Sequence, residues 1–221
     1  MESKTLTLPI SQNDEYGYEL AYRLAGEQLA QIDDIEEQCR KSGTQYLDSQ
    51  KAIVIEYLNQ QYLITLVNIR VSLMDKEEEV PLLDKILLLH YFIQAKGTPI
   101  SNQLISFKEL PEGAGYFPTF YQRAIKPLVT YFGNEPHRLI DMARLLNGHE
   151  ADYGDASVTI NALSRVPLTL VLWQGDAEFP PEGSIMFDRT ISDYLPTEDI
   201  IFLCQTTAWR LVKLLKSAGK L

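Results

Sequence analysis

The residues best suited to chemistry are four acids that follow strand-like segments in the last third of the chain. Asp176 and Glu178 come directly after the apolar run 168–173, while Asp155 and Asp188 lie at the ends of two neighbouring segments of the same kind. Carboxylates at strand ends bind divalent cations, or divide the roles of general acid and base. If these four residues share a metal ion, the chain is a metal-assisted hydrolase. The alternative interpretation is structural, because an aspartate in a turn also accepts hydrogen bonds from backbone amides.

A second candidate site is a pocket for a flat cofactor of the corrinoid or haem type. His149 lies in the sequence NGHEADYG, next to a run of acids, and is the best of the three histidines as a metal or axial ligand. No two histidines are spaced as H-x-x-x-H or H-x-H, which excludes a metal site built from adjacent ligands. Tyr116, Tyr121 and Trp173 are the candidates for the wall of the pocket. The alternative interpretation of the aromatic residues is core packing.

The charge of the chain limits its partners. The formal net charge is −10, and the segment from Glu150 to Asp199 alone holds ten acids and two bases. Phosphate contacts require a basic surface, so nucleic acid is excluded as a partner of these acidic loops. The acidity favours solubility, or alternatively a site for a cation or a cationic partner.

Three features predict a cytoplasmic location. No apolar run approaches the roughly 18 residues that a membrane-spanning helix requires. The first residues, MESKTLTLPISQND, have no apolar signal core, so we expect no secretion and no membrane partner. Cys39 and Cys204 are far apart in the sequence, and we expect both to be reduced thiols.

The spacing of apolar residues predicts helices in the first two thirds of the chain. Spacings of three and four residues predict a long helix over 14–40. A broad apolar surface predicts a buried helix over 81–96. Another helix is predicted over 117–132, where Pro127 must kink or divide it, and a shorter one over 136–146.

Strand-like segments occupy the remaining parts. A hairpin is predicted over 52–73, with its turn at Asn59-Gln60. Three further strands and a final helix are predicted over 157–163, 168–173, 184–187 and 198–217. The fold class is therefore α+β: a mostly antiparallel sheet with a helical middle section and a C-terminal helix packed on it. Because we find no internal repeat and no long linker, we predict one domain over residues 1–221.

Five segments carry a resemblance to a known family. They are DKILLLHYFIQAKGTPI from Asp84, ISFKELPEGAGYF from Ile105, FGNEP from Phe132, YGDA from Tyr153 and LWQGDAEFPPEGSIMFDRTISDYLPTED from Leu172. With these motifs the chain resembles the uncharacterised prokaryotic family called domain of unknown function 3786, over about residues 46–215. The resemblance implies a soluble protein of anaerobic bacteria or archaea, in a family without an established activity.

The resemblance also implies a class of partner. Some relatives look to be joined to a cysteine-rich iron–sulfur domain like that of corrinoid iron–sulfur proteins, so an iron–sulfur or corrinoid protein is an implied partner. This chain has only 2 cysteines and cannot hold a four-cysteine cluster alone. The sequence around His149 lacks the D-x-H-x-x-G pattern of corrinoid-binding domains.

From these observations we predict a binding or accessory protein that holds a flat cofactor or a redox partner between the aromatic middle helices and the acidic loops. The metal-assisted hydrolase is the alternative from a different class. A third alternative is a protein-interaction module, in which the basic face of the last helix meets an acidic partner. The residues of that face are Arg210, Lys213, Lys216 and Lys220.

Overall fold

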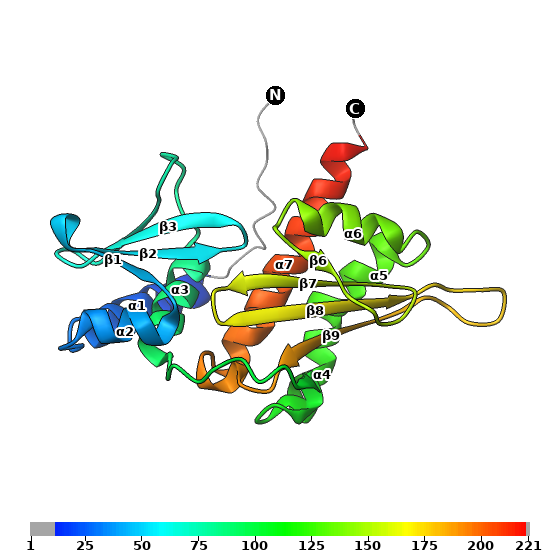
Figure 1. The fold of residues 1–221 in the computed structure, drawn as a ribbon, viewed down its shortest axis with the longest axis horizontal. Coiled ribbons are helices and arrows are strands. Elements are labelled where there is room, and N and C mark those ends of the chain that lie inside the picture. Colours follow the sequence, from blue (N-terminus) through cyan, green and yellow to red (C-terminus); the bar gives the residue numbers. More distant parts are fainter. Residues whose placement is uncertain (1–11, 220–221) are drawn as a thin grey trace.

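The computed structural model describes residues 12–219, in which α-helices pack on a nine-stranded antiparallel sheet (Figure 1). The helices are α1 (Gln12–Leu29), α2 (Ile35–Ser42), α3 (Leu82–Gln94), α4 (Gly113–Phe120), α5 (Lys126–Phe132), α6 (His137–Arg144) and α7 (Thr197–Ala218). The strands are β1 (Gln45–Leu47), β2 (Ala52–Tyr57), β3 (Gln60–Thr65), β4 (Arg70–Leu73), β5 (Leu104–Ser106), β6 (His149–Glu150), β7 (Ala156–Leu163), β8 (Val166–Trp173) and β9 (Glu182–Asp188). The predicted α+β class is therefore confirmed.

The sheet consists of two parts that meet at a narrow junction. Its strand order is β4-β3-β2-β7-β8-β9-β5, with β1 added on β2 and β6 on β7. β2 and β7 are joined by the single residue pair Tyr57–Leu163, beside a hydrogen bond from the Leu58 N–H to the Ala162 carbonyl at 2.9 Å. Figure 1 shows β1–β3 beside α1–α3, and β6–β9 beside α4–α7. The fold thus places the loops at the far end of β8 and β9 away from the N-terminal helices.

The hairpin predicted over 52–73 is present as β2 and β3. Its turn residues Leu58 and Asn59 both have positive φ, 47° and 59°. Two consecutive left-handed residues match the right-handed twist of the paired strands, which explains the tight connection. The sequence did not predict the third strand, β4, which follows on the outer edge of β3.

The prediction of one long helix over 14–40 was wrong, because the chain forms two helices there. α1 ends at Leu29, and α2 starts after Asp34, whose Oδ1 accepts a hydrogen bond from the Glu37 N–H at 2.8 Å. The capping carboxylate satisfies a backbone donor that has no partner within a helix. The apolar spacing continues across the break, so this spacing alone did not reveal it.

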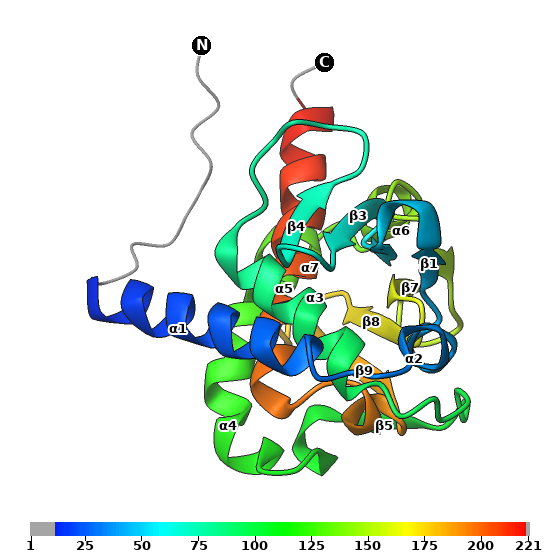
Figure 2. The same ribbon diagram turned by 90° about the vertical axis from the view of Figure 1, so that its left-hand side faces the viewer.

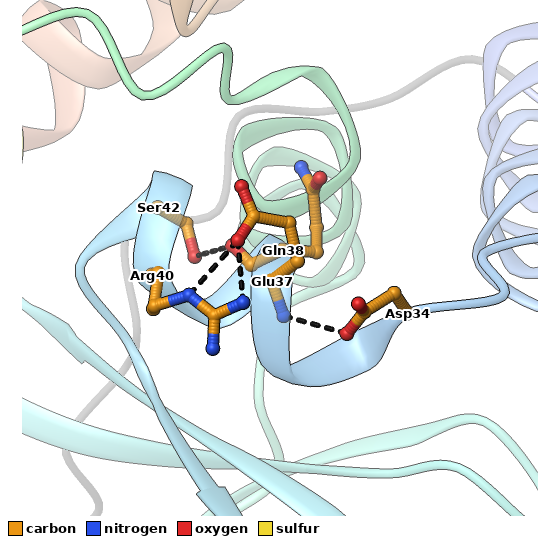
Figure 3. A network of polar contacts seen from close by, with 5 residues as sticks. All are labelled: Asp34, Glu37, Gln38, Arg40 and Ser42. Atoms are coloured by element: carbon orange, nitrogen blue, oxygen red, sulfur yellow. Dashed lines mark hydrogen bonds and ion pairs between the residues drawn. The ribbon is translucent and has the colours of Figure 1, made fainter.

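The buried side chain of Gln38 links α2 to α3. Its Nε2 donates to the carbonyls of Phe92, Ile93 and Ala95 at 2.6, 3.2 and 3.1 Å. The last carbonyls of a helix have no intrahelical donor, so this amide closes the end of α3. Figure 3 shows the Gln38 side chain among its α2 neighbours, with the Ser42 hydroxyl bonded to the Gln38 carbonyl at 2.8 Å.

The middle helices pack side by side with α7 behind β7–β9. Residues 113–132 are continuously helical, and the predicted kink takes the form of a π-helical turn over 121–125, just before Pro127. Proline has no N–H for the preceding turn, and the wider π turn accommodates this. The helix starts earlier than predicted, at Gly113, where a Cβ atom would lie 2.0 Å from the Phe107 carbonyl oxygen. Figure 2 shows α1 lying across α3, on which it packs.

The helices and the two cysteines bear on the predictions about membranes and thiols. No helix between residues 12 and 219 has the length and apolar character needed to cross a membrane. Cys39 and Cys204 are both buried, and neither forms a disulfide.

Candidate functional site

Three loops that are far apart in the sequence meet where β8 leads into β9. We call them together the acidic corner, which comprises residues 133–136, 151–155 and 173–182, where the last range includes the flanking strand residues Trp173 and Glu182. Gln174 connects all three, because its N–H donates to Asp155 Oδ2 at 2.7 Å and its Nε2 donates to the Asn134 carbonyl at 3.2 Å. Figure 1 shows the loop between β8 and β9 projecting beyond the sheet. The corner therefore combines a projecting tip with a base that ties distant loops together.

The tip of the corner has a defined conformation. Asp176 Oδ1 accepts hydrogen bonds from the N–H groups of Glu178 and Phe179 at 2.7 and 2.8 Å. The amides of Phe179 and Glu178 hold the pKa of Asp176 below its usual range. A Cβ atom on Gly175 would lie 2.6 Å from Pro181 Cδ, so the loop closes tightly only around glycine. Asp176 therefore has the turn-forming role that was the structural alternative to metal binding.

Exposed aromatic rings lie among the acids of the corner. Tyr153, Trp173 and Phe179 are 49%, 42% and 68% exposed. The exposed acids around them are Asp152, Asp155, Asp176, Glu178 and Glu182. None of these acids takes part in an ion pair found in the described part of the chain. The corner thus offers uncompensated negative charge and apolar rings on the same surface.

The predicted four-carboxylate metal site does not form. Glu182 starts β9 beside Trp173, whereas Asp188 ends β9 beside Leu104. Six residues of extended strand separate the two ends of β9, a distance of about 20 Å. Within residues 12–219, no group of three or more His, Cys, Asp or Glu side chains is arranged to hold a metal ion. Asp155, Asp176 and Glu178 belong to the corner, and Asp188 does not.

Asp188 instead fixes the loop before β5. Its carboxylate is 2% exposed and accepts hydrogen bonds from the N–H and hydroxyl groups of Ser101 and Thr190 and from the N–H of Asn102. Burial raises the pKa of Asp188, but the hydrogen bonds from Thr190 and Ser101 outweigh it and leave the pKa lowered. A buried carboxylate with these donors has a structural role.

The four residues predicted to hold a flat cofactor do not come together at one place in the fold. Tyr116 lies 17 residues before Gly133, which belongs to the corner. The helix between these two residues is about 25 Å long. Trp173 is at the corner, while Tyr121 is in the π turn between α4 and α5. His149 is exposed on β6, which Figure 1 shows across the sheet from α4. The predicted corrinoid or haem pocket therefore does not form from these residues.

Tyr116, Tyr121 and Trp173 do not pack in the core either, because they are 39%, 38% and 42% exposed. Core packing, the alternative interpretation, applies to phenylalanines near the start of the middle helix. Phe107 and Phe120 are buried and stacked, with ring centroids 3.9 Å apart. Phe187 of β9 lies against both rings. These contacts attach the start of the middle helix to the sheet.

A buried polar network that the sequence did not predict joins the two parts of the molecule. The Tyr57 hydroxyl donates to Asp84 Oδ1 at 3.0 Å. Arg210 donates to the Tyr62 hydroxyl at 3.0 Å and to Gln60 Oε1 at 2.9 Å, and its guanidinium lies 5.1 Å from the centre of the Tyr57 ring. Burial raises the pKa of Asp84 although Arg210 lowers it. The network links β2, β3, α3 and α7 at the sheet junction, so we assign it a structural role.

A second polar link between α3 and α7 involves His90. Its Nδ1 lies 2.6 Å from Asp199 Oδ2, and both side chains are largely buried. The hydrogen bond that His90 donates to the Asp199 carboxylate raises the pKa of His90 against the opposing effect of burial. This contact joins the buried helix α3 to the first turn of α7.

The chain belongs to the family described as Domain of unknown function (DUF3786), whose model matches residues 34–210. This result confirms the resemblance inferred from the sequence motifs. No curated protein and no solved structure matches the chain significantly. All three loops of the acidic corner lie within the matched region.

Proposed function

We propose that this protein is an accessory protein that binds a basic surface of a partner protein through the acidic corner. The observation that carries the proposal is the presence of exposed Tyr153, Trp173 and Phe179 among unpaired acids on and beside a projecting loop. Aromatic side chains contribute a large share of the binding energy at protein interfaces. Surrounding acids attract and orient a basic partner.

The order of the tip supports a binding role. The hydrogen bonds accepted by Asp176 fix the loop, and Gln174 attaches the loop to its neighbours. A loop that already has its bound conformation loses less conformational entropy when a partner binds. The corner is therefore suited to specific recognition.

The sequence predicted an accessory protein that holds a flat cofactor or a redox partner, and we keep the accessory role with a protein as the partner. An iron–sulfur or corrinoid protein, the partner class implied by the family resemblance, meets the requirement if it presents a basic surface. Lysine and arginine side chains of that surface would pair with the acids and also stack on the rings of Trp173 and Phe179.

The test uses the fluorescence of Trp173. The chain has 2 tryptophans, so Trp209→Phe leaves Trp173 as the single reporter at the corner. Titration with a lysine- and arginine-rich probe peptide should change its emission, and raising the salt concentration should weaken the binding. An emission that does not change at low salt, together with no binding heat, would contradict the proposal.

Charge variants locate the binding site. Glu178→Gln with Glu182→Gln removes two exposed charges and leaves the turn-forming Asp176 intact, and we expect about tenfold weaker binding. The matched control is Glu77→Gln with Glu78→Gln, because these acids are also exposed but lie on a different loop. Equal losses in both variants would indicate non-specific attraction. A stoichiometric corrinoid, haem or metal adduct in native mass spectrometry would instead favour one of the other functions.

A further inference from the structure

A second exposed aromatic surface lies on α5 and α7 and carries the opposite charge. Trp209 and Tyr131 are 40% and 37% exposed, and their ring centroids are 6.2 Å apart. Lys216 Nζ lies 3.1 Å from the Tyr131 hydroxyl and 4.6 Å from the centre of its ring. Lys213 lies one helical turn from both Trp209 and Lys216, so all three are on one side of α7. We call these four residues the basic helix face.

The charge of this face differs from that of the rest of the chain. Residues 113–132 contain no acid, and α7 contains none after Asp199. Arg123 and Lys126 are exposed on the middle helix and add to the positive charge. Arg210 was predicted to belong to the basic face, but it points instead into the buried network. Lys220 lies outside the described residues.

We propose that the acidic corner of one copy of this chain docks on the basic helix face of a second copy. This inference rests on the proposed function, because the same corner makes the contact, and it names the partner. Each surface presents exposed aromatic rings, and the charges of the two surfaces are opposite. Docking of the corner on the face brings the negative segment 150–199 against the end of α7 that contains no acid.

Electrostatics favours this orientation over others. With a net charge of −10, two copies repel each other unless unlike surfaces meet. The corner and the helix face consist of different residues, so the contact is heterologous. Heterologous contacts build closed rings or open chains, in contrast to two-fold dimers in which the same surface meets itself.

The experiment measures the mass of the full chain by sedimentation velocity from about 1 to 200 μM, a range that detects micromolar association. We expect the mass to increase with concentration at low salt, and this increase to be lost at about 0.5 M salt because exposed charges are then screened. A chain that stays monomeric at every concentration and at low salt would overturn the inference.

Two charge-reversal variants identify the surfaces. Glu178→Lys with Glu182→Lys removes most of the negative charge of the corner, and Lys213→Glu with Lys216→Glu reverses the charge of the face. Each variant alone should be monomeric. An equimolar mixture should form a one-to-one complex, because the unmodified acidic corner of the second variant then meets the unmodified basic face of the first. The control Glu77→Lys with Glu78→Lys should associate like the unmodified chain.

The outcomes separate this inference from the proposed function. Association that survives both reversals, or a mixture that stays monomeric, overturns the second-copy inference. If the unmodified chain is monomeric but its corner still binds the basic probe peptide, only the second-copy inference fails. If the Glu178→Gln and Glu182→Gln variant binds the peptide as tightly as the unmodified chain, the proposed function fails as well.

Discussion

Substitution of Gln38 tests how the end of α3 is held. The Gln38 amide is the donor for three carbonyls at the end of this helix, those of Phe92, Ile93 and Ala95. Gln38→Met keeps the length of the side chain but removes its donors, which should lower the free energy of unfolding by about 2–3 kcal/mol. For a chain of this size, that loss corresponds to a melting temperature lower by about 4–12 °C.

Gln38→Glu adds a dependence on pH. A carboxylate oxygen would replace Nε2 at 2.6 Å from the Phe92 carbonyl oxygen, so burial and repulsion should raise the pKa of the new carboxyl in the folded state. The unfolded state then releases its proton at lower pH than the folded state does. The free energy of unfolding should therefore fall as the pH rises above about 4.3, by up to about 1.4 kcal/mol per pH unit.

The assay is urea unfolding followed by circular dichroism at pH 5 and pH 8. We expect Gln38→Glu to be less stable than Gln38→Met at pH 8 and to recover much of the difference at pH 5. The control is Gln28→Glu, the same change at an exposed position of α1. Stabilities of both Gln38 variants within about 0.5 kcal/mol of the unmodified chain would refute the assigned role.

Three further predictions follow from individual contacts. Asp188→Ala leaves five partly buried donors without their acceptor and should lower the free energy of unfolding by about 3 kcal/mol in thermal unfolding, whereas a loss below about 1 kcal/mol would contradict this. The contact with Asp199 raises the pKa of His90, so its stabilisation should be complete below about pH 6.5 and disappear as the pH rises through the folded-state value. His90→Gln should abolish this decline in urea unfolding between pH 5 and pH 9, and a decline that persists would have another origin. Gly175→Ala brings a Cβ atom to 2.6 Å from Pro181 and should weaken peptide binding at the corner with little change in melting temperature. Unchanged affinity would show that binding does not need this loop conformation.

Most elements were predicted because their signals are local. The hairpin was predicted, although its turn falls at Leu58 and Asn59, one residue before the predicted Asn59-Gln60. The acids at the start of α7 fit its predicted beginning. The division of the N-terminal helix was missed because the apolar spacing runs across it. A single capping residue, Asp34, decides that break, and its effect depends on the conformation that the chain adopts before α2.

The candidate site was predicted only in part. The loop after β8 was singled out from the sequence, and the turn-forming role of Asp176 was one of the interpretations offered for it. The sequence did not show that Asn134, Asp155 and Gln174 are neighbours, because their loops are separated by whole strands and helices. Hydrogen bonds between such distant segments exist only after the sheet has assembled.

The sequence by itself determined the α+β class, the acidic segment after residue 150 and the basic end of the last helix, because composition and periodicity depend only on residue order. The tertiary structure alone decided which of these charged residues act together. Antiparallel pairing of β8 and β9 carries Asp188 about 20 Å from the corner that holds Asp176. Packing of α7 against the β2–β3 hairpin turns Arg210 inward and leaves Lys213 at the surface. Side chains that are alike in the sequence thus acquire different roles, because burial and neighbours are properties of the folded chain.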